Sequence, residues 1–79
     1  MKELEILQSL TDIFKEFFDD NELILTYEST AEDIEDWDSL AQVGLILSIE
    51  RTFSLKLNST EVSKLENVGE MVKLISTKI

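Results

Sequence analysis

Residues 37–53 read WDSLAQVGLILSIERTF, and this stretch determines how the chain folds. In an α-helix over residues 39–53, at about 100° per residue, the apolar side chains fall on two faces. The face that we expect in the core has Leu45, Ile46, Ile49 and Phe53. The second face, which we call the Leu40 stripe, consists of Leu40, Val43 and Leu47, and Glu50 lies between the two.

The two faces are hard to bury together in a chain of 79 residues, because a domain of this size has little material to surround one helix. We therefore expect the Leu40 stripe to be partly exposed, as is typical of a docking surface. The alternative is that the loop before the helix covers the stripe. Gly44 would be explained by the close approach of a neighbouring helix or of a partner, or by simple tolerance.

Three further helices are predicted by spacing. Residues 2–18 carry apolar side chains three and four positions apart, which indicates an amphipathic helix. Its apolar set is Ile6, Leu7, Leu10, Ile13, Phe14, Phe17 and Phe18. A short helix is predicted over residues 59–65, and a final helix is predicted over residues 67–78. The buried positions expected on the final helix are Val68, Met71, Val72 and Ile75. Asn58 with Glu61, and Asn67 with Glu70, have the spacing of capping boxes.

Residues 19–38 show no helical period, and a loop of this length inside a small domain has to be anchored. The side chains available to anchor it are Leu23, Ile24, Leu25, Tyr27, Ile34 and Trp37. The chain has two Gly and no Pro, which favours helices over a turn-rich β-fold. We therefore predict one all-α domain over residues 1–79, a small four-helix bundle with three main helices, one short helix and a long first loop.

The net charge is −10 at pH 7, from 17 acidic and 7 basic residues. Such a surface repels phosphate backbones and anionic lipid headgroups, so we expect neither nucleic acid nor a membrane as a partner. Basic patches on other proteins are better partners, although acidic surfaces equally often serve solubility alone. The beginning, MKELEILQSL, has acidic residues where a signal peptide has its apolar run. We expect a cytoplasmic monomer.

The chain contains neither Cys nor His, which excludes disulfides, thiolate metal sites and the usual general base in the unmodified protein. Ser39 is therefore a poor candidate for a hydrolase nucleophile, since it has no neighbouring base and no G-x-S-x-G context. The segment DIEDWD at 33–38 gathers carboxylates, so a Ca²⁺ site is one minor interpretation. The order of an EF-hand loop is absent, and we expect no metal site.

Two residues compete to cap the helix that begins near position 39. Ser39 and Gln42 have capping-box spacing, but Asp38 is an equally good N-cap and suits the helix dipole. If Asp38 is the cap, the Ser39 hydroxyl is available at a helix N-terminus. Backbone N–H groups and the dipole both favour negative charge there, which makes the position suitable for a phosphate ester.

These residues resemble the acyl carrier proteins, a family of small acidic helical proteins related to peptidyl carrier domains. DSL at 38–40 is similar to the family's attachment motif, and LAQVGLILSIERTFSLKLNSTEVSKLENVGEMVKLI at 40–75 follows its helix pattern without a gap. The resemblance implies a 4′-phosphopantetheine arm on Ser39, added from coenzyme A by a phosphopantetheinyl transferase. It also implies that Asp38 positions the serine and the transferase's metal.

The resemblance further implies that Leu40, Val43 and Leu47 contact partner enzymes that load and process acyl or aminoacyl groups, and that the chain itself catalyses nothing. Many fatty-acid carriers have acidic residues along this helix, whereas residues 39–53 here carry no net charge. We therefore expect docking to use the Leu40 stripe with Glu35 and Asp36, and the pathway to be a specialised one. Trp37 is most simply an anchor for the loop, although it could instead shield the arm. The alternative function is a helical interaction module without a prosthetic group.

Overall fold

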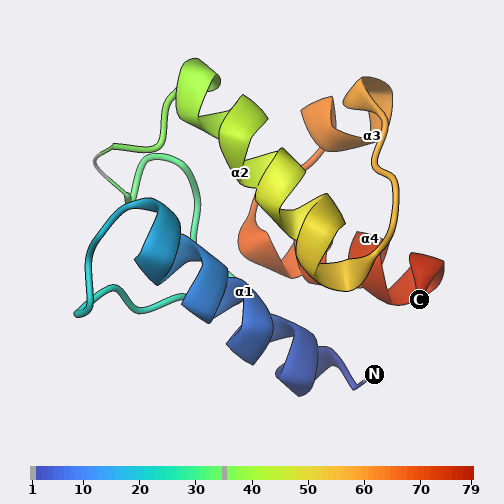
Figure 1. The fold of residues 1–79 in the computed structure, drawn as a ribbon, viewed down its shortest axis with the longest axis horizontal. Helices are drawn as coiled ribbons and strands as arrows, with labels where there is room; N and C mark the ends of the chain where they lie inside the picture. The colour runs from blue at the N-terminus through green and yellow to red at the C-terminus, as the bar shows by residue number, and fades with distance from the viewer. Residues whose placement is uncertain (1, 35) are drawn as a thin grey trace.

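The computed structural model describes residues 2–34 and 36–79, and four α-helices account for most of them. They are α1 (Glu3–Phe17), α2 (Ser39–Phe53), α3 (Ser59–Ser63) and α4 (Val68–Lys78), as Figure 1 shows. No strand occurs in these two ranges. The all-α prediction, with three main helices, one short helix and a long first loop, is confirmed. The bounds of α2 are those predicted, and the other helices begin or end within two residues of their predictions.

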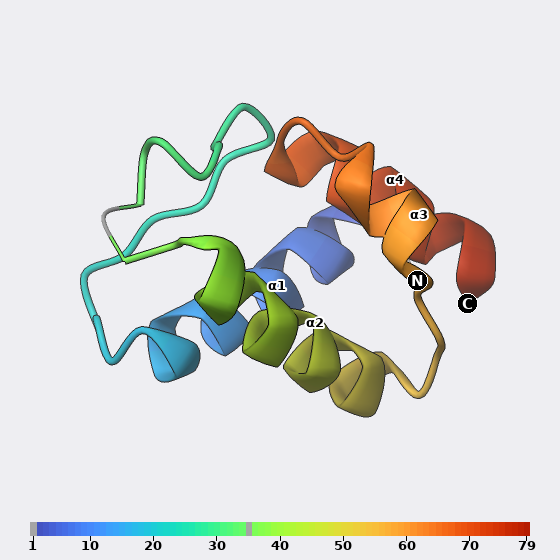
Figure 2. The same cartoon turned by 90° about the horizontal axis from the view of Figure 1, so that it is seen from above.

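The core lies where α1 packs against both α2 and α4. In Figure 2, α2 runs in front of α1, and α4 lies on the other side of α1 with α3 beside it. The largest fully buried side chains come from these three main helices. They are Ile6, Leu10 and Phe14 of α1, Leu45 and Ile49 of α2, and Val68, Met71, Val72 and Ile75 of α4. Complete burial of each such side chain contributes about 1.5–3 kcal/mol. None of the described helices has the length and apolar character needed to cross a membrane.

The close approach predicted as one explanation of Gly44 occurs between α1 and α2. A Cβ at this position would lie 2.9 Å from Cε1 of Phe17 and 3.0 Å from its Cζ. The small residue therefore lets the Phe17 ring lie directly on α2. Phe17 itself remains exposed, unlike the other aromatic side chains of this segment, Phe14 and Phe18, which are buried or partly buried in the core.

The first loop is anchored by Leu23 and Leu25, which are buried, and by Ile34 and Trp37, which pack on the core. The prediction that Ile24 anchors the loop is wrong, because its side chain is 80% exposed. Ile24 lies outside any helix between Leu23 and Leu25, and these two side chains enter the core while that of Ile24 stays in solvent.

Tyr27 also differs from the prediction, because its side chain is exposed and the residue anchors the loop through its backbone. The carbonyl of Tyr27 accepts a hydrogen bond from the Gly69 N–H at 2.8 Å, and that of Ser29 accepts one from the Val68 N–H at 2.8 Å. These two amides belong to the first turn of α4, where N–H groups have no partner within the helix. The loop thus supplies the acceptors that the start of α4 needs.

The two predicted capping boxes have different outcomes. At α3 the box is complete, since Asn58 Oδ1 accepts from the Glu61 N–H at 2.8 Å and Glu61 Oε2 accepts from the Asn58 N–H at 3.3 Å. At α4 only half is present. Asn67 Oδ1 accepts from the Glu70 N–H at 2.9 Å, but the Glu70 carboxylate accepts from the N–H of Glu66 instead.

Candidate functional site

The N-terminus of α2 is capped by Asp38 and not by Ser39. Asp38 has extended backbone angles (φ −112°, ψ −173°), and its Oδ1 accepts a hydrogen bond from the Ala41 N–H at 2.8 Å. Its carbonyl accepts from the Gln42 N–H at 2.9 Å, which is the first bond of the helix ladder. Ser39 is therefore the first helical residue. It is exposed, and its hydroxyl makes no hydrogen bond within residues 2–34 and 36–79.

Gln42 has a role that the sequence pattern did not reveal. Its Oε1 accepts a hydrogen bond from Nε1 of Trp37, so it does not complete a capping box with Ser39. The Trp37 ring meets the ring of Phe14 edge to face, with centroids 5.0 Å apart and planes at 86°. A partly buried indole N–H needs a hydrogen-bond acceptor. In the sequence, the only sign of this role of Gln42 is that Trp37 needs such an acceptor nearby. Trp37 thus joins α1 to the start of α2, as expected of a loop anchor.

Ser39 stands at the edge of a surface hollow of about 320 Å³. The segment before α2 and its first turn contribute Trp37, Asp38, Ser39 and Gln42, and the opposite side comes from the segment before α4 and from Met71. A second hollow, of about 580 Å³, lies between α2 and α3. Gln42 and Leu65 line both hollows, so the two are adjacent along α2.

The Leu40 stripe is exposed, as predicted, and the first loop does not cover it. Leu40 is 84% exposed, Val43 62% and Leu47 55%. On the core face of the same helix, Leu45 and Ile49 are fully buried, while Ile46 and Phe53 are partly buried. The stripe begins directly beside Ser39, so a protein that reaches this serine also meets the stripe.

The charges around Ser39 come from the preceding loop. Asp36 and Asp38 are exposed, whereas Glu35, which we also expected to contact partners, lies outside the described residues. Within α2, Glu50 and Arg51 are the charged residues, and the Glu50 carboxylate accepts a hydrogen bond from the Leu57 N–H at 2.7 Å. In the part of the chain that the structure describes, no three acidic side chains gather in an arrangement that could hold a metal ion.

The geometry fits a phosphate ester on Ser39. Ser39 is exposed at the first position of a 15-residue helix, where backbone amides and the helix dipole stabilise negative charge. Because the side chain of Asp38 carries the cap, a modified Ser39 leaves the start of α2 intact. The adjoining hollow offers space for a group attached to the serine oxygen.

Comparison with known proteins gives concordant results. Residues 8–75 match the family model described as "Phosphopantetheine attachment site". The chain is 30% identical over 77 residues to the acyl carrier protein of Lactobacillus johnsonii, covering 98% of this chain and 96% of that protein. The fold is similar to the solution NMR structure of the holo acyl carrier protein from Geobacter metallireducens, with a TM-score of 0.86 and 43% identity over 91% of this chain and 83% of that one. The family model matches most of the chain, and both relatives are acyl carrier proteins, so the chain belongs to the phosphopantetheine-dependent acyl carrier protein family.

Proposed function

We propose that Ser39 is the attachment point of the 4′-phosphopantetheine arm, on which this chain carries acyl or aminoacyl intermediates as thioesters. The observation that supports this most directly is the exposed hydroxyl at the first position of α2, beside an Asp that already caps the helix. The arm, when attached, supplies the terminal thiol that holds the acyl group. The chain has no Cys of its own, so this thiol is its reactive sulfur.

In the transfer step, the oxygen of Ser39 forms the new bond to phosphorus, and its proton passes to the transferase. The bond that breaks is the phosphorus–oxygen bond to the nucleotide part of coenzyme A, which leaves as adenosine 3′,5′-bisphosphate. Asp38 has one carboxylate oxygen committed to the Ala41 N–H, which fixes the orientation of the group beside the serine. The other carboxylate oxygen would then be available to hold the transferase's metal ion. The chain catalyses no step itself and acts with separate enzymes.

The Leu40 stripe is the proposed contact surface for those enzymes, together with the acidic residues Asp36 and Glu35 before it. Partners that fit this surface have an apolar patch for Leu40, Val43 and Leu47, and basic groups for the loop.

Because Glu50 and Arg51 leave α2 without net charge, we propose a specialised pathway and not general fatty-acid synthesis. The cargo is tested by measuring the intact mass of the protein purified from its own cells. We also propose that the protein is a monomer, which light scattering tests, and that it is cytoplasmic, which cell fractionation tests.

The attachment site is tested by incubating the protein with coenzyme A and a broad-specificity phosphopantetheinyl transferase, and then measuring its intact mass. We expect the mass of one arm to be added to the wild type and nothing to Ser39→Ala. The matched control is Ser59→Ala, because Ser59 is also an exposed serine at the first position of a helix, after the cap Asn58. This variant should be modified like the wild type. A modified Ser39→Ala protein, or a wild type that stays unmodified with several transferases, would contradict the assignment.

A further inference from the structure

The helix α3 differs from the other helices in how it is held. It has five residues, Ser59–Ser63, and none of them is buried. The helices α1, α2 and α4 each contribute fully buried side chains to the core. On α3, only Val62 packs partly against that core, and the apolar anchors Leu57 and Leu65 lie just outside the helix. With so little of α3 itself buried, its polar contacts also help to hold it in position.

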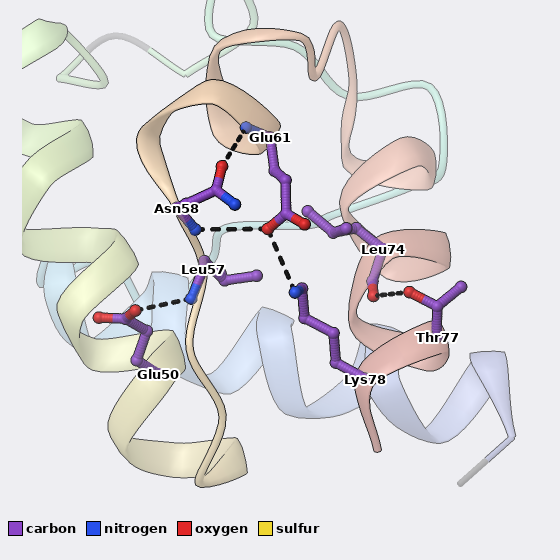
Figure 3. A network of polar contacts seen from close by, with 7 residues as sticks. All are labelled: Glu50, Leu57, Asn58, Glu61, Leu74, Thr77 and Lys78. Carbon is purple, nitrogen blue, oxygen red and sulfur yellow. Dashed lines mark hydrogen bonds and ion pairs between the residues drawn. The ribbon is translucent and has the colours of Figure 1, made fainter.

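Those polar contacts come from both neighbouring helices, as Figure 3 shows. Before α3, Glu50 of α2 accepts a hydrogen bond from the Leu57 N–H at 2.7 Å. On α3 itself, Glu61 Oε2 lies 3.2 Å from Nζ of Lys78, in the last turn of α4. The same oxygen accepts from the Asn58 N–H. Because that hydrogen bond and the nearby ammonium both stabilise the carboxylate, the pKa of Glu61 is lowered from its ordinary value.

The location of α3 gives these contacts a consequence for the site. The hollow of about 580 Å³ has α2 on one side, with Val43, Ile46 and Leu47, and on the other side Ser59, Val62 and Ser63 of α3. It borders the hollow beside Ser39, since Gln42 and Leu65 line both. The α2 side is fixed by the fully buried Leu45 and Ile49. The width of this hollow therefore depends on the position of α3.

We propose that the Glu61–Lys78 ion pair is a latch that holds α3 in place and thereby sets how far the hollow next to Ser39 opens. The hydrogen bond from the Leu57 N–H to Glu50 holds the segment before α3 and is the second contact that fixes this helix. Lys78 and Glu61 are positioning residues in this account, since they act through α3 and not on the attached group. The importance of the latch for the carrier rests on the proposed function of Ser39, but its action on α3 does not.

The ion pair is partly exposed, so dissolved salt weakens it. This gives a specific test by NMR amide hydrogen exchange on the unmodified protein. The reporters are the amides of Val62, Lys64 and Leu65, which donate to Asn58, Glu61 and Val62. We expect Lys78→Met to raise their exchange rates about two- to fivefold, the range that partly exposed ion pairs support. Addition of 1 M NaCl should raise them similarly in the wild type and hardly at all in Lys78→Met.

Two variants distinguish the latch from general destabilisation. Lys73→Met makes the same substitution at an exposed position of α4 and should leave the α3 amides unchanged. Lys78→Arg keeps the positive charge and should restore slow exchange. Amides of the core residues Leu10 and Ile49 should exchange alike in all variants. Equal α3 exchange in Lys78→Met and the wild type, or faster exchange of α3 and the core together, would overturn the proposal. Since no transferase or arm is involved, failure here is distinguishable from failure of the Ser39 assignment.

Discussion

The carboxylate of Asp38 has two roles that substitution can separate. It caps α2 through the Ala41 N–H at 2.8 Å, and under the proposed function it also positions the transferase's metal ion. Asp38→Ala removes both roles, whereas Asp38→Asn keeps a capping oxygen and removes the charge. Loss of an N-cap costs about 1 kcal/mol, which lowers the Tm of a domain of this size by about 4–8 °C. Asn caps helices about as well as Asp, so we expect Asp38→Asn to melt close to the wild type.

The two roles are measured by separate assays on the same proteins. Thermal unfolding followed by circular dichroism reports the cap, and the initial rate of arm addition by intact mass reports the contact with the transferase. We expect both variants to accept the arm at least about tenfold more slowly, because a hydrogen bond or contact to a charged group is worth about 1.5–3 kcal/mol. Asp12→Asn, at an exposed position of α1, is the control and should behave as the wild type in both assays. If Asp38→Asn accepts the arm at the wild-type rate, the carboxylate is only a cap and the reasoning is refuted.

The remaining predictions concern stability and are measured by urea unfolding. Gly69→Ala should lower the free energy of unfolding by about 1–3 kcal/mol, because the new Cβ would lie 2.8 Å from the backbone oxygen of Tyr27, which cannot turn away. Gly44→Ala should stay within about 1 kcal/mol of the wild type, since its new methyl meets the end of the exposed Phe17 ring, which can rotate, and alanine favours the helix. If both substitutions changed the free energy of unfolding equally, the distinction between a backbone contact and a side-chain contact would be contradicted. Ser54→Gly should raise the free energy of unfolding by about 1 kcal/mol. The reason is that Ser54 follows the last residue of α2 with φ 55°, a left-handed conformation that glycine adopts at lower cost. A lower free energy of unfolding in this variant would contradict the prediction.

The sequence predicted best those features that depend on local pattern. The bounds of α2 follow from the cap at Asp38 and from a continuous apolar series, and both act within a few residues. The division of α2 into a core face and the exposed Leu40 stripe was also predictable, because helix geometry alone separates the two sets. The assignment of Ser39, Asp38 and the contact residues to the carrier's chemistry stays a prediction.

The predictions that failed depend on the path that the backbone takes outside the helices. Tyr27 anchors the loop through its carbonyl because the start of α4 needs an acceptor there, and no side-chain pattern encodes this. Ile24 is as apolar as its neighbours, but Leu23 and Leu25 enter the core and leave its side chain in solvent. The capping box expected from Glu70 is incomplete for the same reason. Its carboxylate had two amides within reach, and the path of the chain before α4 decided which one it bonds.

The position of Trp37 has a practical consequence. It is the chain's single tryptophan, it rests edge-on against Phe14, and it lines the same hollow as Ser39. Under the proposed function, a group joined to that serine and turned into the hollow would change the polarity around the indole ring. If Ser39 carries the arm, we expect the native fluorescence of the protein to be a label-free optical reporter of its attachment, because Trp37 lies two residues before that serine in the chain.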